Sequence, residues 1–222
     1  MTKKLDEKSY LGNANIKSAG VDTEYTKEQI EEYAKCASDP MYFIETYIKI
    51  VSLDEGLVQF KPYDFQKNIL NSIHDDRFVI CKMPRQSGKS TTVISYLLYY
   101  VLFNPQVNVA ILANKLSTAR ELLSRLKLAY EHLPKWLQQG VVEWNKGSIV
   151  LENGSKILAS STSSSAVRGG SFNLIFMDEF AFVPENVADE FFSSVYPTIS
   201  AGQTTKVLIV STPKGLNMFT NF

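Results

Sequence analysis

The chain has 222 residues, of which 45% are hydrophobic and 21% are charged, and its formal net charge is zero. This length suffices for one sizeable α/β core, and zero net charge argues against coating nucleic acid by bulk electrostatics, although a local basic groove is compatible with it. The two cysteines, Cys36 and Cys81, have no metal-ligand spacing and predict reduced thiols. The longest nearly apolar run, 93–103, is too short to cross a bilayer, so no membrane partner is expected.

Three units are expected along the chain. Residues 1–24 are polar and rich in Gly, Asn and Ser, which predicts a flexible N-terminal arm. Residues 25–60 are expected to form a helical lead-in packed on the core, because "TKEQIEEYAKCAS" has a helical pattern and "DPMYFIETYIKIV" places a proline at a helix start. Residues 61–222 form the main domain. This domain is expected to be truncated, because the chain ends just after the pattern of a helix start, in "KGLNMFTNF".

From Arg77 onward, short apolar strands alternate with longer helical patterns. Strands are expected at "RFVICKM", "VNVAILA", "NLIFMD" and "KVLIVST", and helices over 90–103, 115–133 and 185–200. The stretch "VVEWNKGSIVLENGSKILAS" predicts successive strands joined by turns. In the helix over 115–133 the apolar residues from Leu116 to Leu133 are expected to face inward. Buried strands that alternate with helices predict an α/β fold with a mostly parallel sheet covered on both faces.

The stretch "MPRQSGKST" contains Gly88-Lys89-Ser90, the end of the phosphate-binding pattern G-x-x-x-x-G-K-[ST], but Met83 stands where the pattern has its first glycine. A G-K-[ST] tripeptide occurs by chance in roughly one chain in ten of this length. Its flanks favour a phosphate loop, because it follows an apolar strand and opens a helix. Pro84 disfavours helical geometry at Met83, so the strand is expected to continue into the loop. A left-handed residue at 83 would cost about 1–2 kcal/mol.

A second motif is "NLIFMDEFAFVP", an apolar strand that ends in Asp178-Glu179. A carboxylate at the end of a strand beside the phosphate-loop strand can hold Mg²⁺, usually through water. The next carboxylate points elsewhere and can orient and deprotonate an attacking water. The alternatives are a surface turn before a buried helix for the first motif and a helix cap for the second.

These motifs together resemble the ATPase domain of the large terminase subunit, the motor that packages DNA into the capsids of tailed bacteriophages. The resemblance rests on "MPRQSGKST", "AVRGGSFNLIFMDEFAFVP", "STPKGLNMF" and "PYDFQKNIL", and covers roughly residue 37 to the C-terminus. It implies a P-loop NTPase of the recombinase-like type (additional-strand catalytic glutamate), with a mostly parallel sheet flanked by helices and a helical N-terminal lead-in.

The resemblance also implies roles for matching positions. Gln66 would contact the adenine edge and Arg85 would sense the γ-phosphate. Glu179 would be the catalytic carboxylate. Arg168 would reach in trans into the ATP site of a neighbouring subunit. An arginine finger contributes about 10³–10⁵ in rate, so an isolated monomer is expected to hydrolyse ATP poorly.

The complete expected site has four groups of residues. The ATP-binding residues are Gln66, Arg85, Gln86, Ser87, Gly88, Lys89, Ser90 and Thr91. The catalytic residues are Glu179, Lys89, Arg85 and Arg168. The Mg²⁺ ligands are Ser90 and Asp178. The residues that would couple hydrolysis to movement are Ser211, Thr212 and Pro213.

The first functional hypothesis is an ATP-hydrolysing motor domain, using ATP and Mg²⁺, that drives double-stranded DNA into a procapsid. By resemblance it would act as a homo-oligomeric ring with a portal protein and a small terminase subunit, in the cytoplasm of an infected bacterial host. The alternatives are a superfamily-two helicase and, in another class, a truncated nucleotide-binding or assembly fragment without turnover. The family's nuclease domain is absent from these residues, so no nuclease activity is expected of them.

Overall fold

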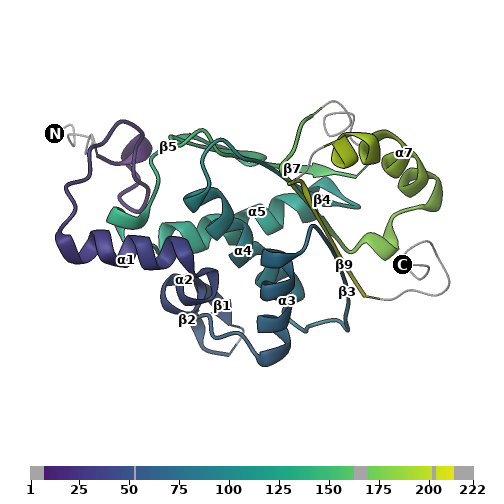
Figure 1. Ribbon diagram of the computed structural model, residues 1–222, viewed down its shortest axis with the longest axis horizontal. Coiled ribbons are helices and arrows are strands. Elements are labelled where there is room, and N and C mark those ends of the chain that lie inside the picture. The colour runs from purple at the N-terminus through teal and green to yellow at the C-terminus, as the bar shows by residue number, and fades with distance from the viewer. Residues whose placement is uncertain (1–7, 53, 163–169, 202–203, 213–222) are drawn as a thin grey trace.

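The computed structural model describes residues 8–52, 54–162, 170–201 and 204–212 (Figure 1). The helices are α1 (Lys27–Ser38), α2 (Pro40–Tyr47), α3 (Asp64–Asp75), α4 (Lys89–Phe103), α5 (Leu116–Glu131) and α7 (Glu185–Ala201), with the short 3-10 helices η1 (Tyr10–Gly12), η2 (Lys135–Leu137) and η3 (Phe180–Phe182). The strands are β1 (Lys49–Ser52), β2 (Gly56–Gln59), β3 (Phe78–Lys82), β4 (Asn108–Ala113), β5 (Val141–Trp144), β6 (Ser148–Leu151), β7 (Lys156–Ser161), β8 (Leu174–Asp178) and β9 (Lys206–Ser211). None of the described helices is both long and apolar enough to cross a membrane.

The main sheet has seven strands in the order β3-β9-β8-β4-β7-β6-β5. The pairs from β3 to β7 are parallel, and β7, β6 and β5 continue as antiparallel neighbours, which confirms the mostly parallel sheet and the successive strands predicted before β8. One expectation is wrong: β8 is not beside the phosphate-loop strand β3, because β9 lies between them. Residues 207–211 of β9 are all buried, as an interior strand of a parallel sheet requires.

Helices cover both faces of this sheet. The helices α3, α4 and α5 lie on one face and α7 lies on the other (Figure 1). Successive side chains of a strand point to opposite faces, so Val109 and Ile111 of β4 join the core under α4 and α5, whereas Ala110 and Leu112 join the core under α7. The first residue of α5, Leu116, is exposed against expectation, because this turn borders a cavity rather than the sheet.

The lead-in begins with two helices, as predicted. Thr26 and Gln29 form a capping box at the start of α1, and Pro40 is the first residue of α2. Residues 49–59, however, form the antiparallel hairpin β1–β2 instead of continuing a helix. The run of β-branched residues from Ile48 to Val51 favours extended backbone, and Gly56 adopts a positive φ of 72° where the second strand begins.

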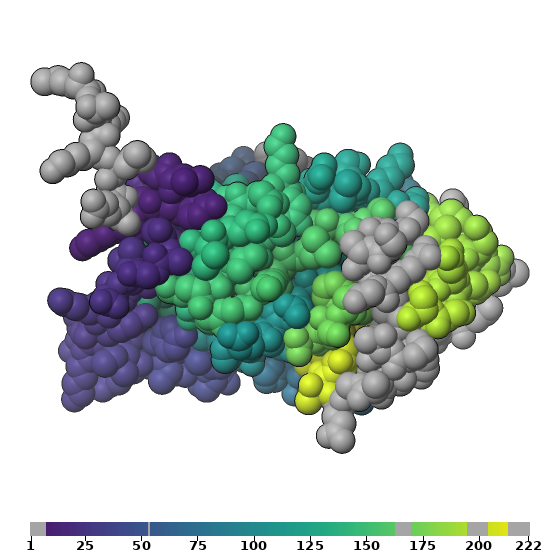
Figure 2. All heavy atoms as spheres, turned by 90° about the horizontal axis from the view of Figure 1, so that it is seen from above, coloured from purple at the N-terminus to yellow at the C-terminus, as the bar shows by residue number. Residues whose placement is uncertain are grey.

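The stretch predicted as a flexible arm is packed on the core over its described residues 8–20. Ile16 is only 1% exposed, and the backbone that follows it is hydrogen-bonded to the start of β5. The buried Gln138 amide accepts from Lys17 N (2.9 Å) and donates to Asn15 O (2.9 Å). Figure 2 shows this purple segment lying against the green middle part of the chain. Ile16, the partly buried Tyr10 and the buried Gln138 amide hold this otherwise polar segment on the core, which its composition does not predict.

The strand β9 is also tied to α3. The Lys206 ammonium, at the start of β9, donates to the carbonyl oxygens of Ile73 (2.9 Å), His74 (2.8 Å) and Asp76 (2.8 Å). These carbonyls lie at the C-terminal end of α3, where a helix leaves acceptors without intrahelical partners and favours a cation. Burial lowers the Lys206 pKa. The contact fixes one end of α3 to the N-terminal end of β9.

Candidate active site

The connection from β3 to α4 starts as the sequence predicts. Met83 N donates to Ser211 O (3.1 Å), which extends the pairing of β3 with β9 by one residue. Met83 does not adopt a positive φ; within this loop Gln86 and Gly88 do, at 60° and 72°. The missing first glycine is therefore compatible with the loop, because the chain continues as a strand at that point. The left-handed Gln86 was not predicted.

The loop leads directly into the N-terminus of α4. Gly88 is the residue before the helix, and no described side chain caps the first turn. The N–H groups of this turn lack intrahelical acceptors and carry the positive end of the helix dipole, which makes the turn suitable for an anion. Both Gly88 and Lys89 line the adjoining cavity.

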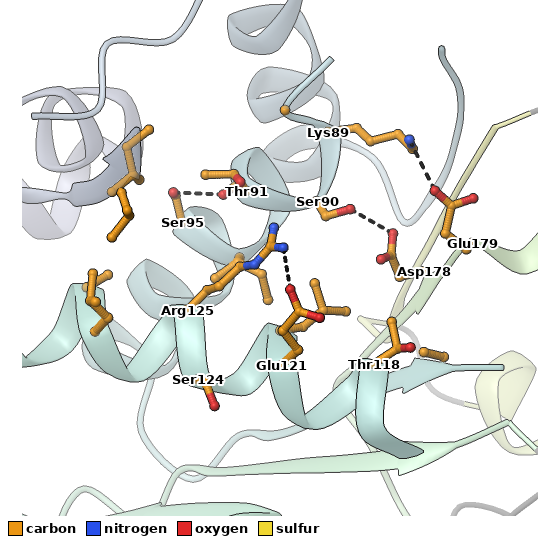
Figure 3. Close-up of a pocket in the computed structure, with 18 of the residues that line it drawn as sticks. Lys89, Ser90, Thr91, Ser95, Thr118, Glu121, Ser124, Arg125, Asp178 and Glu179 are labelled. Carbon is orange, nitrogen blue, oxygen red and sulfur yellow. Dashed lines mark hydrogen bonds and ion pairs between the residues drawn. The ribbon is translucent and has the colours of Figure 1, made fainter. Parts of the chain in front are cut away.

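Asp178 stands at the end of β8 and faces the start of α4. The Ser90 hydroxyl donates to Asp178 Oδ1 at 2.9 Å, as Figure 3 shows. Asp178 is 4% exposed, and this burial raises its pKa to about 6, with the neighbouring Glu179 charge adding to the rise. The Ser90 hydrogen bond and the Lys89 charge oppose it. Burial thus makes the ionised form of Asp178 unfavourable in free energy unless a nearby cation compensates its charge.

Glu179 leaves the strand direction by adopting left-handed backbone, with φ 50° and ψ 42°. Its Oε1 atom lies 3.3 Å from Lys89 Nζ, and its Oε2 atom accepts from Thr212 N (3.3 Å) and from the Ser211 hydroxyl (3.4 Å). Lys89 Nζ also donates to Thr212 Oγ1 (3.2 Å). Lysine, carboxylate and the end of β9 therefore form one hydrogen-bonded group.

These side chains open into a cavity of about 1120 Å³, larger than the ~300–1,000 Å³ of most small-molecule sites. Its lining includes most of the residues predicted from sequence, namely Arg85, Gln86, Gly88, Lys89, Ser90, Thr91, Asp178 and Glu179. The lining does not include Ser87, Gln66, Ser211 or Thr212. Of these, Ser211 and Thr212 donate hydrogen bonds to Glu179, which does line the cavity. Arg168 and Pro213 lie outside the described residues.

The opposite wall of the cavity was missed from the sequence. It is built by α5, with Thr118, Glu121 and Arg125, and by Lys49–Val51 of β1. Arg125 pairs with Glu121 at 2.6 Å (Figure 3). Spacing of four residues on the polar face of an amphipathic helix predicts only a solvated pair. The packing of α5 against α4, which is a long-range contact, places this pair in the cavity.

Ser90 and Asp178 are chemically suited to Mg²⁺. Both supply oxygen, which this hard cation prefers, and Mg²⁺ commonly takes one or two carboxylates from the protein and the rest from phosphate and water. Within the described part of the chain there is no group of three or more His, Cys, Asp or Glu side chains that could form an all-protein metal cage. The pair therefore fits a metal ion delivered with a phosphate ligand.

Comparison with known proteins gives consistent results. A family model described as terminase large subunit, T4likevirus-type, N-terminal, matches residues 80–222. The terminase large subunit of Escherichia phage T5 is 30% identical over 184 residues, which is 81% of this chain and 40% of that protein. The large terminase of bacteriophage HK97 superposes with a TM-score of 0.66 at 18% identity, over 79% of this chain and 37% of the other.

The large terminase ATPase domain of Thermus phage P74-26 has a TM-score of 0.59 at 25% identity, over 73% of this chain and 69% of that one. The chain thus spans about two fifths of the length of the whole subunits that it matches. The fold, the order of the motifs and the family model agree, and the chain belongs to the terminase large-subunit family, of which it matches the N-terminal part.

Proposed function

We propose that this chain is the ATP-hydrolysing motor domain of a phage terminase large subunit, which drives double-stranded DNA into a procapsid. The observation that carries the proposal is the convergence of Lys89 and Ser90, at the start of α4, with Asp178 and Glu179, at the end of β8, on one cavity. A phosphate-binding helix start, a pair suited to Mg²⁺ and a second carboxylate are the parts that phosphoryl transfer to water needs.

The chain's own residues have distinct tasks in this proposal. The N–H groups at the start of α4 and the Lys89 ammonium bind the phosphate oxygens, and Ser90 with Asp178 would hold Mg²⁺, which neutralises charge on the phosphates. Glu179 orients the attacking water and accepts its proton. Arg85, at the cavity wall, is the candidate for sensing the γ-phosphate.

The pairing of Lys89 with Glu179 has a consequence for the order of events. In the structure the Lys89 ammonium pairs with the carboxylate that would act as base. A bound triphosphate offers Lys89 several negative oxygens in the same cavity and competes with Glu179 for it. Arrival of the nucleotide thereby releases the carboxylate for the attacking water.

Partners of the assembled motor are part of the proposal. Double-stranded DNA is the cargo, and a portal protein, a small terminase subunit and further copies in a ring are the expected protein partners, in the cytoplasm of the infected host. Support comes from membership of the terminase family. Because an arginine finger contributes about 10³–10⁵ in rate, the proposed role of Arg168 ties full activity to assembly.

Calorimetric titration of Mg²⁺-ATP into this chain tests the proposal, with Lys89→Ala as the variant and Lys127→Ala as a control outside the cavity. Binding is expected in the wild type and in the control, and is expected to vanish in Lys89→Ala. Equal binding by all three proteins, or none by a wild type whose circular dichroism is that of a folded protein, contradicts the proposal.

A further inference from the structure

Gln66, which the family resemblance assigns to the adenine edge, has a different environment in the structure. Its side chain is 3% exposed and does not line the cavity. The amide oxygen accepts from Tyr63 N at 2.9 Å, and the amide nitrogen donates to Ser87 O at 3.1 Å. The first bond is part of the capping box of α3, and the second joins α3 to the backbone of the phosphate loop.

The bond to Ser87 O constrains the amide group that faces the phosphate site. In a planar trans peptide the C=O and the following N–H point in opposite directions. The carbonyl of Ser87 accepts from Gln66, which does not line the cavity, so the N–H of Gly88 in the same peptide points away from Gln66. Gly88 itself lines that cavity at the start of α4.

Close packing supports the same arrangement. A Cβ atom added at Gly88 would lie 2.5 Å from the Gln66 amide nitrogen, and Gly88 has a φ of 72°. The left-handed backbone favours glycine here, and a side chain at this position would also displace the Gln66 amide. The buried amide leaves little room for this peptide to rotate.

We infer that Gln66 is a positioning residue for the phosphate loop: it fixes the peptide between Ser87 and Gly88 so that the Gly88 N–H is presented to a bound phosphate group. This inference rests on the proposed function and deepens it. Gln66 then affects binding of any ligand with a terminal polyphosphate, whatever base it carries. A residue that reads adenine would instead affect only adenine nucleotides.

The variant Gln66→Glu separates the two hydrogen bonds. A glutamate oxygen can still accept from Tyr63 N and keep the α3 cap, but a carboxylate has no N–H to donate to Ser87 O. Gln66→Met removes both bonds at similar volume. Thermal unfolding of the three proteins reports the cap, and competition against a fluorescent ATP analogue gives the affinities for ATP, GTP and inorganic tripolyphosphate.

The expected result is that Gln66→Glu and Gln66→Met both bind ATP, GTP and tripolyphosphate more weakly by the same factor, about tenfold, since one positioned hydrogen bond is worth about 1–1.5 kcal/mol. A lower unfolding temperature is also expected for Gln66→Glu, because its carboxylate is buried and faces the Ser87 carbonyl. Faster amide exchange at Gly88 is expected in the same variant. Weakening confined to ATP overturns the inference in favour of adenine contact. Unchanged affinities in both variants, with a lower unfolding temperature, make Gln66 only a helix cap. A wild type that binds none of the three ligands removes the proposed function as well.

Discussion

Glu179 combines an unusual backbone with a complete set of partners. A non-glycine residue at positive φ costs roughly 1 kcal/mol or more, and such conformations concentrate at functional sites. Here the left-handed turn takes Glu179 out of the β8 alternation, so that Asp178 and Glu179 both reach the cavity from adjacent positions. The Ser211 hydroxyl accepts from Ala181 N at 3.0 Å and helps to hold this turn. Two carboxylates in one short segment thus face the same cavity with different partners.

Replacing Glu179 by glutamine is expected to preserve binding of Mg²⁺-ATP and to lower turnover by about 10²–10⁴, the usual contribution of a general base. An amide of the same shape can still accept from Thr212 N but cannot take a proton from water. Steady-state phosphate release measures turnover, and Glu185→Gln, an exposed residue at the start of α7, is the control. Ordinary hydrolysis by Glu179→Gln would remove this residue from the mechanism.

Asp178→Asn is expected to make the metal-free protein more stable at pH 7.5, by about 1–3 kcal/mol, while abolishing hydrolysis. The Asp178 pKa is raised to about 6 by burial, from an ordinary 3.8, and that difference corresponds to at most about 3 kcal/mol. Between these two values the folded state binds the proton more tightly than the unfolded state. Wild-type stability therefore falls relative to the variant as pH rises from about 4 through 6.

Urea unfolding in the presence of a chelator, at pH 7.5 and at pH 4, checks this prediction. The variant's advantage should be present at pH 7.5 and should largely disappear near pH 4, where the wild-type carboxyl is protonated in the folded state and partly protonated in the unfolded state. A variant that is less stable than the wild type at pH 7.5 would show that the ionised carboxylate is already compensated without metal.

At the scale of elements, periodicity and helix signals predict most of the architecture, because they are local. The strand β3, the helix α4 with its stop at Asn104-Pro105, and the antiparallel strands β5–β7 follow the sequence pattern closely. The position of β9 between β3 and β8 does not, since strand order depends on long-range pairing. The hairpin β1–β2 was missed because its four-residue strands are too short for a strong periodic signal.

The N-terminal segment gives a stability prediction. Ile16→Ala is expected to cost about 2–5 kcal/mol, the range for a buried aliphatic side chain truncated in a core, because Ile16 is buried between this segment and the main domain. Leu11→Ala, in the same segment but 84% exposed, should change stability by less than about 0.5 kcal/mol. Chemical denaturation compares the two. Equal effects of the two substitutions would mean that the segment is not docked in solution.

At the scale of the whole molecule, the residues predicted for the site fall into two groups. The position of some follows from a local motif, and the position of others depends on long-range packing. Lys89, Ser90, Asp178 and Glu179 lie in motifs whose flanks specify their position, and the fold brings them together. Gln66 follows a motif as well, yet its burial and its bond to the loop depend on the packing of α3 beside α4, which no local pattern encodes. The wall formed by α5 depends on the same kind of packing.

The proposed assembly gives a prediction that can be tested only with more than one copy of the chain. If Arg168 acts in a neighbouring site, Arg168→Ala and Lys89→Ala should each lose turnover by about 10³ or more, and a mixture should recover it, because one variant supplies the arginine and the other supplies an intact binding site. Phosphate release is measured for each variant and for the mixture at a concentration at which the chain assembles. A mixture no faster than its separate components would place Arg168 in its own subunit's site or in none.

The three bonds of Lys206 to the end of α3 complete a closed series of contacts that joins α3, β9 and the phosphate loop. Gln66 joins the start of α3 to the phosphate loop, and Lys206 joins the other end of α3 to β9. At the other end of β9, Thr212 N donates to Glu179. Glu179 in turn pairs with Lys89, which directly follows the phosphate loop. Secondary-structure elements that are joined in a closed series of contacts have fewer independent motions than the same elements joined in an open series. The phosphate loop, α3, β9 and Glu179 are therefore coupled, and a displacement of any one of them is resisted by contacts with two of the others.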